Sequence, residues 1–283
     1  MEVARRLEWF PAPGKLNLFL HVLGRRPDGM HELQTVFRLI EHADQIGIRV
    51  REHGVVRRIE PIAEIAEADD LCIQAARKLQ SASGVGLGVD LGLRKVLPIG
   101  GGLGGGSSDA ATVLLVLNRL WRTGYSRKEL MALAQTLGAD VPLFVYGENA
   151  IGEGIGERLS ALALPSRWYV VLVPNARVGT ASVFADNALT RNTKALKIPP
   201  FFFGLGGNDL EPLVARRHPE IAAHLEWLRA RQAEARMTGS GSCVFAEFAD
   251  EGEARRVLAE LPEGMRGFVT RGLDRHPLHD WAN

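Results

Sequence analysis

The sequence predicts an α+β protein, and three observations support this fold class. Two runs of alternating apolar and polar residues near the start, 15–22 and 33–39, have the period of β-strands. Longer segments with helical periodicity follow, the clearest at residues 108–121. The predicted strands and helices then alternate irregularly, unlike the regular strand–helix order of a parallel α/β sheet.

Length and composition indicate one large or two modest globular domains. The chain has 283 residues, 46% of them hydrophobic and 24% charged, so it can bury a sizeable core and is not intrinsically disordered. A net charge of +1 provides no overall field for nucleic acid or an anionic membrane. Two isolated cysteines make neither a disulfide framework nor a zinc site. Because no apolar run is long enough to span a bilayer and no cleavage signal is found, we expect a soluble cytoplasmic protein.

The first predicted elements are strands joined by tight turns. In the first alternating run, Lys15 and Asn17 lie on the same face of the strand. Residues 26–29, Arg-Pro-Asp-Gly, are typical of a turn and precede the second run. The other elements before residue 98 are predicted as a pair of strands at 46–50 and 55–59, a helix at 69–79 and a strand at 89–93.

The second half of the chain alternates helices with single strands. A helix at 127–137 is predicted between Ser126, a typical N-cap, and Gly138, a typical stop. Glycines at 151–157 predict a turn-rich break, where we place the boundary between an N-terminal domain, 1–158, and a C-terminal domain, 159–283. The rest is predicted as a strand at 168–174, a loop at 199–207, a helix at 220–235, a turn and strand at 237–248 and a helix at 251–261.

Six glycines occupy the seven positions 100–106, between a predicted strand and a predicted helix. Glycine allows backbone N–H groups to approach a ligand closely, and the start of a helix adds unpaired N–H groups and a positive dipole end. Ser107 and Ser108 can cap this helix or donate to an oxyanion. We therefore predict a phosphate-binding segment. A flexible linker is the alternative, although linkers are typically longer and flanked by polar residues.

This glycine run does not fit three common nucleotide-binding loops. A Walker A loop requires a lysine after its last glycine, whereas Ser107 follows Gly106. A dinucleotide fingerprint matches positions 100, 102 and 105, but so many glycines make this match almost automatic, and no acidic residue follows at the ribose position. A protein kinase requires a His-Arg-Asp motif, which the sequence lacks.

Residues 98–111 resemble the second motif of the GHMP kinases (galactose, homoserine, mevalonate and phosphomevalonate kinases), in a long form with two additional glycines, Gly105 and Gly106. Residues 13–18 are similar to the first motif of the family and residues 237–245 to the third. Further matches at 26–31, 137–142 and 208–211 follow in the same order, so the resemblance covers most of the chain.

The resemblance implies a fold and cofactors. The implied architecture has an N-terminal ATP-binding domain like ribosomal protein S5 domain 2, a C-terminal ferredoxin-like α/β domain, and a cleft between them. The implied activity is phosphoryl transfer from ATP, with Mg²⁺, to an alcohol. The ATP-binding residues would be Pro98, Ile99, Gly100, Gly101, Gly102, Leu103, Gly104, Gly105, Gly106, Ser107 and Ser108.

The resemblance also implies two catalytic residues. Asp140 would accept the proton of the acceptor hydroxyl group. Lys15, one of six lysines, would keep this carboxylate ionised and orient the attacking oxygen. The residues alone leave alternatives open, because Asp140 is also well placed as a helix N-cap and Lys15 could be an exposed strand residue.

The long glycine motif is similar to that of the branch of the family that phosphorylates the 2-hydroxyl of a cytidine-diphosphate-linked methylerythritol. By this resemblance, Asn17, Met30, His31 and Phe184 would bind the acceptor, with residues 30 and 184 on the two faces of the cytosine. Two residues depart from the branch: Met30 replaces a usual tyrosine, and Asp70 replaces a usual asparagine. A thioether can still pack on a ring face.

Three alternative functions stay open at this point. A GHMP kinase could use a mevalonate- or sugar-type acceptor. A nicotinamide dehydrogenase would bind NAD(H), and an RNA-binding module would need a basic stripe. We expect a small-molecule substrate, no nucleic-acid or membrane partner, and a monomer or weak homodimer. The sequence does not assign metal ligands.

Overall fold

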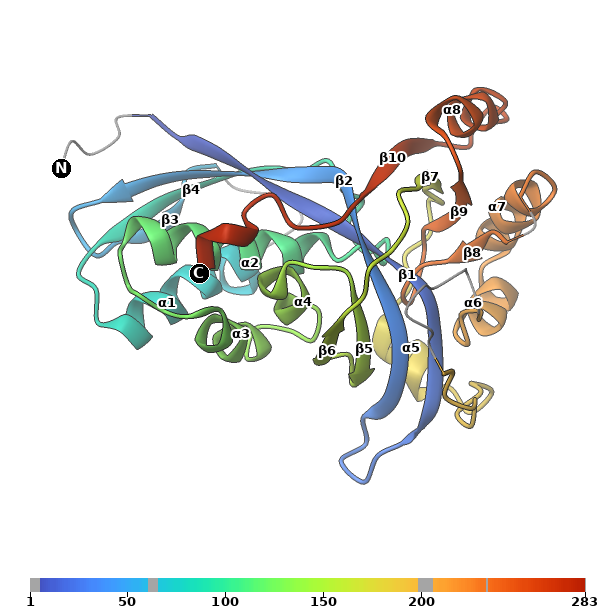
Figure 1. The fold of residues 1–283 in the computed structure, drawn as a ribbon, viewed down its shortest axis with the longest axis horizontal. Helices are drawn as coiled ribbons and strands as arrows, with labels where there is room; N and C mark the ends of the chain where they lie inside the picture. Colours follow the sequence, from blue (N-terminus) through green and yellow to red (C-terminus); the bar gives the residue numbers. More distant parts are fainter. Residues whose placement is uncertain (1–5, 61–65, 198–205, 233, 283) are drawn as a thin grey trace.

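The computed structural model describes residues 6–60, 66–197, 206–232 and 234–282. Its central feature is a long, curved antiparallel strand pair (Figure 1). β1 (Glu8–Arg25) and β2 (His31–Arg51) pair along almost their whole length. The prediction of a separate strand at 46–50 is wrong, because the buried residues of β2 continue through Ile40 to Ile46 and Ile48 without a turn.

Two further strands and four helices complete the first half. β4 (Gly88–Arg94) pairs with the second half of β2, and β3 (Val56–Arg58) pairs in parallel with β4 at the edge. The predicted strand at 55–59 therefore exists, but β4 separates it from β2. The helices lie on one face of this sheet (Figure 1). They are α1 (Leu71–Ser83), α2 (Gly105–Leu120), α3 (Arg127–Gln135) and α4 (Val141–Tyr146), with the short 3-10 helix η1 (Glu67–Asp69) before α1.

Residues 150–161 form a hairpin, so the prediction of a turn-rich break at 151–157 is wrong for its first part. β5 (Ala150–Gly154) pairs with β2, with Gly152 opposite Thr35, and β6 (Arg158–Ala161) pairs with β5. A Cβ at Gly152 would lie 2.5 Å from the ring of Phe37. Glycine at this position therefore allows the ring to pack closely on the strand. In the sequence alone, the same glycines look like those of a turn.

The second half continues the same ten-stranded sheet in the order β2-β10-β7-β9-β8. The helix predicted at 220–235 ends at residue 229, and the sequence analysis missed α6 and β10. The predicted loop at 199–207 lies largely outside the described residues. The elements are β7 (Trp168–Leu172), α5 (Thr180–Ala185), α6 (Glu211–Arg217), α7 (Pro219–Arg229), β8 (Arg236–Met237), β9 (Val244–Phe248), α8 (Glu251–Ala259) and β10 (Gly267–Leu273).

The end of the chain returns to the first half. β10 pairs with β2 as well as with β7. After it, the 3-10 helix η2 (His279–Ala282) packs on α2, and Leu278 and Ala282 are buried in the same apolar cluster as α1 and α2. The boundary after residue 158 stays a prediction, but residues 278–282 contribute to the core of the first half.

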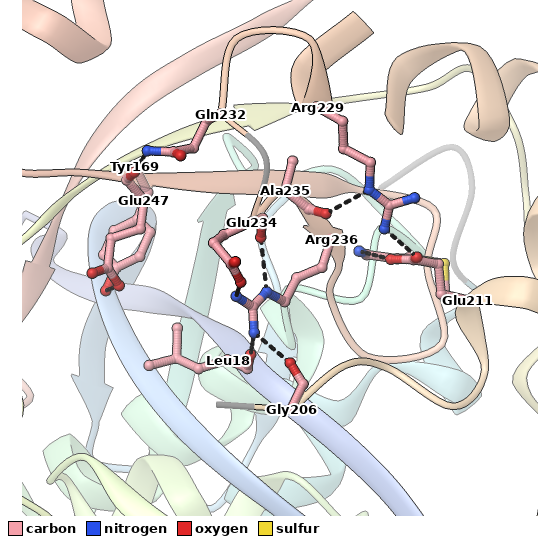
Figure 2. A network of polar contacts seen from close by, with 11 residues as sticks. Leu18, Tyr169, Gly206, Glu211, Arg229, Gln232, Glu234, Ala235, Arg236 and Glu247 are labelled. Atoms are coloured by element: carbon pink, nitrogen blue, oxygen red, sulfur yellow. Dashed lines mark hydrogen bonds and ion pairs between the residues drawn. The ribbon is translucent and has the colours of Figure 1, made fainter. Parts of the chain in front are cut away.

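Arg236 joins the two halves through backbone carbonyl groups (Figure 2). Its Nη1 donates hydrogen bonds of 2.8 Å to the carbonyl oxygens of Leu18 in β1 and Gly206. Nearby, Glu211 accepts the N–H of Met237 at 2.8 Å and pairs with Arg229. These contacts fix β8, and the turn that follows it, against β1.

Candidate active site

The glycine segment turns sharply and leads directly into α2. Gly100, Gly102 and Gly104 have φ angles of 72°, 80° and 71°, a region that glycine adopts at little cost. The helix begins at Gly105, earlier than the predicted start at residue 108, and the N–H of Ser108 donates its first bond, to the carbonyl of Gly104 at 2.9 Å. The N–H groups of residues 105–107 therefore have no acceptor within the helix and are available to an anion.

A cavity of about 290 Å³ lies on one side of this segment, and we call it the nucleotide cavity. Residues 98–107, the predicted ATP-binding segment, all line it, together with Lys95 and the start of α1. Ser108 does not line it; its side chain is fully buried, and its hydroxyl has no hydrogen-bond partner among the described residues. The structure thus brings ten of the eleven predicted residues to one cavity.

Asp70, the departure noted in the sequence, has a structural role at the wall of this cavity. Its carboxylate accepts the N–H of Cys72 at 2.9 Å and so caps α1. It also forms an ion pair with Arg58. The ion pair favours a carboxylate over an amide at this position, whereas either side chain can cap a helix.

Lys15 and Asp140 lie together beside the glycine segment, as predicted. The Nζ of Lys15 is 3.3 Å from Oδ2 of Asp140. The N–H of Lys15 donates to the carbonyl of Leu103 at 2.9 Å, which ties β1 to the segment. Lys15 is 3% exposed, so its charge is largely removed from water. The side chain of Asp140 is 36% exposed and is therefore accessible to a ligand in the adjoining cavity. Although Asp140 precedes α4, its side chain makes no capping hydrogen bond.

Asn17 holds the ammonium group of Lys15 in place. Its Oδ1 accepts a short hydrogen bond from Lys15, while its Nδ2 donates to the hydroxyl of Thr35 at 2.9 Å. Its backbone N–H donates to the hydroxyl of Thr238 at 2.9 Å. The sequence analysis missed both threonines. Thr35 lies on an alternating strand, which was a weak signal. Thr238 lies within residues 237–245, which resemble the third motif of the family, but no role was assigned to it.

The turn after β8 packs against the glycine segment. A Cβ at Gly102 would lie 2.3 Å from the carbonyl oxygen of Thr238, and Cys243 donates its N–H to the carbonyl of Gly101 at 3.1 Å. Asn208 supports the turn by donating to the carbonyl of Gly239 at 2.7 Å. Residues 237–243 and 100–104 therefore form one structural unit, although they are far apart in the sequence.

A second cavity of about 350 Å³ lies on the other side of the glycine segment, and we call it the acceptor cavity. It shares Gly100, Gly102, Gly104 and Ser107 with the nucleotide cavity. Lys15 and Asp140 are the charged residues among the described residues that line it. Polar side chains of Asn17, Thr35, Thr180 and Ser240 also line it, and the hydroxyl oxygens of Thr180 and Ser240 are 2.7 Å apart.

The residues predicted to bind the base are only partly assembled. The rings of His31 and Phe184 lie 5.0 Å apart with a tilt of 38°, and Phe184 lines the acceptor cavity. Arg191, which the sequence analysis missed, donates to Nε2 of His31 at 3.0 Å and to the carbonyl of Phe184 at 2.8 Å. Burial, with Arg191 and Arg25 nearby, lowers the pKa of His31, so its imidazole is neutral with the proton on Nδ1. Met30 is 48% exposed in the β1–β2 turn and does not line this cavity.

A magnesium ion would find few ligands here. The described residues contain no group of three His, Cys, Asp or Glu side chains that could hold a metal ion. Asp140 is the carboxylate of the acceptor cavity. Asp69, Asp70 and Asp109 line the nucleotide cavity, but they form no such group either. This donor set fits an ion that is held mainly by nucleotide phosphates and water, which is the usual mode for Mg²⁺.

Two family profiles match this chain. The profile described as the GHMP kinases N terminal domain matches residues 70–148, and the profile described as GHMP kinases C terminal matches residues 194–267. Among the described residues, no helix is both long enough and apolar enough to cross a membrane.

Curated relatives match nearly the whole chain. A 4-diphosphocytidyl-2-C-methyl-D-erythritol kinase of Nitrosospira multiformis is 58% identical over 274 residues, which are 96% of this chain and 93% of the relative. A kinase of the same name from Thiobacillus denitrificans is 58% identical over 273 residues, covering 96% and 98% of the two chains.

A crystal structure of 4-(cytidine 5'-diphospho)-2C-methyl-D-erythritol kinase superposes with a TM-score of 0.81 at 35% identity, covering 94% of this chain and 100% of that one. The mevalonate kinase of Methanococcus jannaschii, at 14% identity and a TM-score of 0.65 over 95% and 99% of the chains, shares the fold. From the matched profiles and the near-complete relatives, the chain belongs to the GHMP kinase family.

Proposed function

We propose that this protein transfers the γ-phosphoryl group of ATP to the 2-hydroxyl group of 4-diphosphocytidyl-2-C-methyl-D-erythritol. The observation that carries the proposal is the Lys15–Asp140 pair, 3.3 Å apart, which lines the acceptor cavity directly beside the glycine segment. The names and high identity of the curated relatives support this acceptor over a mevalonate- or sugar-type alcohol.

The nucleotide would bind on the other side of the glycine segment. The unpaired N–H groups at the start of α2 and the positive end of its dipole suit the phosphates. Mg²⁺ bound with the nucleotide would neutralise part of the phosphate charge. Because the two cavities share Gly102 and Gly104, the terminal phosphate would lie at their junction.

Asp140 would act as the general base of the reaction. Its carboxylate accepts the proton as the O–H bond of the acceptor breaks and the oxygen bonds to phosphorus; the bond from phosphorus to the bridging oxygen breaks, and ADP leaves. The ammonium of Lys15 forms an ion pair with this carboxylate and lies where it can also orient the attacking oxygen. Asn17 and Thr35 keep this ammonium in place, so they act through Lys15.

Phe184 and His31 would bind the cytidine end of the acceptor. Phe184 offers a ring face at the cavity wall, and the neutral His31 has an Nδ1–H that can donate to an acceptor atom of the base. Asn17 would contact the polyol end near the reacting hydroxyl. We assign Met30 a supporting place beside the base, by its position next to His31 in the β1–β2 turn.

Release of ADP from ATP and Mg²⁺, measured with four separate acceptors, tests this proposal. The acceptors are 4-diphosphocytidyl-2-C-methyl-D-erythritol, mevalonate, homoserine and galactose. We expect ADP release with the cytidine compound alone. Release with another acceptor would keep the kinase chemistry and overturn the substrate. Absence of release with all four, although ATP binds, would overturn the proposed activity.

A further inference from the structure

A second cluster of charged side chains lies at the nucleotide cavity, separate from Lys15 and Asp140. Asp44 is fully buried in β2 and accepts hydrogen bonds from the N–H groups of Val96 and Leu97, at 2.5 and 2.8 Å, and from Nζ of Lys95 at 2.5 Å. The same Nζ is 3.0 Å from Oδ2 of Asp109 in α2. The cluster therefore combines one ammonium group with two carboxyl groups.

This cluster supports the first turn of α2. Lys95 and Asp109 both line the nucleotide cavity. A Cβ at Gly105 would lie 3.0 Å from Nζ of Lys95 and 3.3 Å from Oδ2 of Asp44. Gly105 is one of the two additional glycines of the long motif. Because it has no side chain, Lys95 and Asp44 can pack against the first turn of α2, whose N–H groups would bind phosphate.

The two carboxyl groups of the cluster are not equivalent. Asp44 has three hydrogen-bond donors, whereas Oδ1 of the buried Asp109 has no hydrogen-bond partner among the described residues. An ionised carboxylate that is buried with an unsatisfied oxygen is unfavourable, so Asp109 is the member that gains most from holding a proton. Burial raises the pKa of Asp109 to about 8, against the opposing charge of Lys95 and in the same direction as the charge of Asp44.

Two neighbouring groups, Lys95 and Cys72, have pKa values above that of Asp109. Burial lowers the pKa of Lys95, but the two carboxylates outweigh this effect and raise it above its ordinary value of 10.5. The ammonium group therefore stays charged. From α1, the thiol of Cys72 faces the cluster, and burial raises its pKa well above the ordinary value. Asp70, also at the start of α1, is paired with Arg58. Of Asp109, Lys95 and Cys72, Asp109 is therefore the group that changes charge between neutral and alkaline pH.

We propose that Asp109 is a positioning residue of the nucleotide site and is protonated when the nucleotide binds, so that binding at alkaline pH takes up one proton. This inference rests on the proposed function, because it assumes ATP in the nucleotide cavity. The phosphates bring several negative charges to the turn directly above the cluster. An ionised Asp109 would repel them through a medium of low dielectric, and the bound state therefore favours the neutral acid.

Calorimetric titration of the full-length protein with ATP tests the proposal. The titration is done between pH 7.5 and 9.5, where ATP itself is fully ionised, in pairs of buffers with different heats of ionisation. We expect uptake of close to one proton in the alkaline part of this range and an affinity that falls by about tenfold across it. Asp109→Asn, which is always neutral, should abolish the uptake and hold the affinity within about twofold.

Asp69→Asn is the matched control, because Asp69 lines the same cavity but is exposed. It should keep the wild-type proton uptake. Equal pH slopes for wild type and Asp109→Asn, or a wild type that takes up no proton, would overturn the role of Asp109 while leaving the kinase function intact. Failure of ATP to bind at any pH would overturn the proposed function instead. If Asp109→Asn does not fold, the measurement on the wild type still tests the proposal, because binding of ATP without proton uptake would overturn it.

Discussion

The nucleotide and acceptor cavities use different kinds of groups on the two sides of one glycine segment. The nucleotide side is made mostly from consecutive backbone, residues 98–107, with unpaired N–H groups at the start of α2. The acceptor side also includes glycines, but the groups that distinguish it are side chains of β1, β2, α5 and the residue before α4. A backbone site tolerates most changes except those at its glycines, whereas a side-chain site depends on single residues and on the placement of several segments.

The largest expected effect is the loss of the base on the acceptor side. Asp140→Asn should lower kcat by about 10²- to 10⁴-fold, because an amide cannot take up the proton of the hydroxyl group. ATP affinity, measured by calorimetry, should stay near the wild-type value, since Asp140 does not line the nucleotide cavity. Glu153→Gln, an exposed carboxylate of β5, is the control and should retain full turnover. A normal kcat in Asp140→Asn would remove it as the base.

A change at Gly104, which lines both cavities, should affect both ATP binding and turnover. In Gly104→Val, the Cβ would lie 2.9 Å from the ring of Phe144 and 3.2 Å from Cε of Lys15, at a φ of 71°. Backbone strain of about 1–3 kcal/mol should weaken ATP binding by about tenfold or more, and displacement of Lys15 should also lower kcat. Gly84→Val is the matched control, because Gly84 has a φ of 67° far from both cavities. Equal ATP affinity in both variants would show that the phosphate site is misplaced.

A change at Phe184 should affect the acceptor side alone. Phe184→Ala should raise the KM for the cytidine substrate by about tenfold, because a stacked aromatic contact contributes about 0.5–1.5 kcal/mol in addition to the buried area. The KM for ATP and kcat should change by less than about threefold. Steady-state kinetics with each substrate varied in turn measures this, and Phe184→Tyr, which keeps the ring, should stay close to wild type. An increase in the KM for ATP instead would contradict the assignment.

The smallest expected effect is at Met30. Met30→Tyr restores the residue usual in the branch that the sequence resembles, and we expect a KM for the cytidine substrate about twofold to threefold lower, within the range of a single added ring contact. The effect is small because position 30 is exposed in the β1–β2 turn and is not part of the cavity wall. An unchanged KM would show that position 30 does not contact the base.

The difference between a site made of consecutive backbone and a site made of distant side chains also explains which parts of the site the sequence could predict. The glycine segment was predicted because its residues are consecutive and glycine has a specific backbone role. Lys15 and Asp140, 125 residues apart, were paired through the family resemblance, and no local pattern could pair them. Thr238 and Arg191 were missed because their contacts exist only after distant segments pack together. The wrong interpretation of residues 151–154 has a similar origin, since a glycine can admit a neighbouring ring as well as start a turn.

The length of β2 has a consequence for how the protein unfolds. Its Thr35 and Phe37 line the acceptor cavity, its Ile40 pairs with β10, and its Asp44 anchors Lys95 below the nucleotide cavity. Backbone amides along the strand are bonded to β1, β4 and β5, so neither end can separate without breaking a shared ladder. Both cavities therefore belong to one cooperative unit, and we expect the amide hydrogens at the two ends of β2 to exchange with solvent deuterium at matching slow rates, through global unfolding.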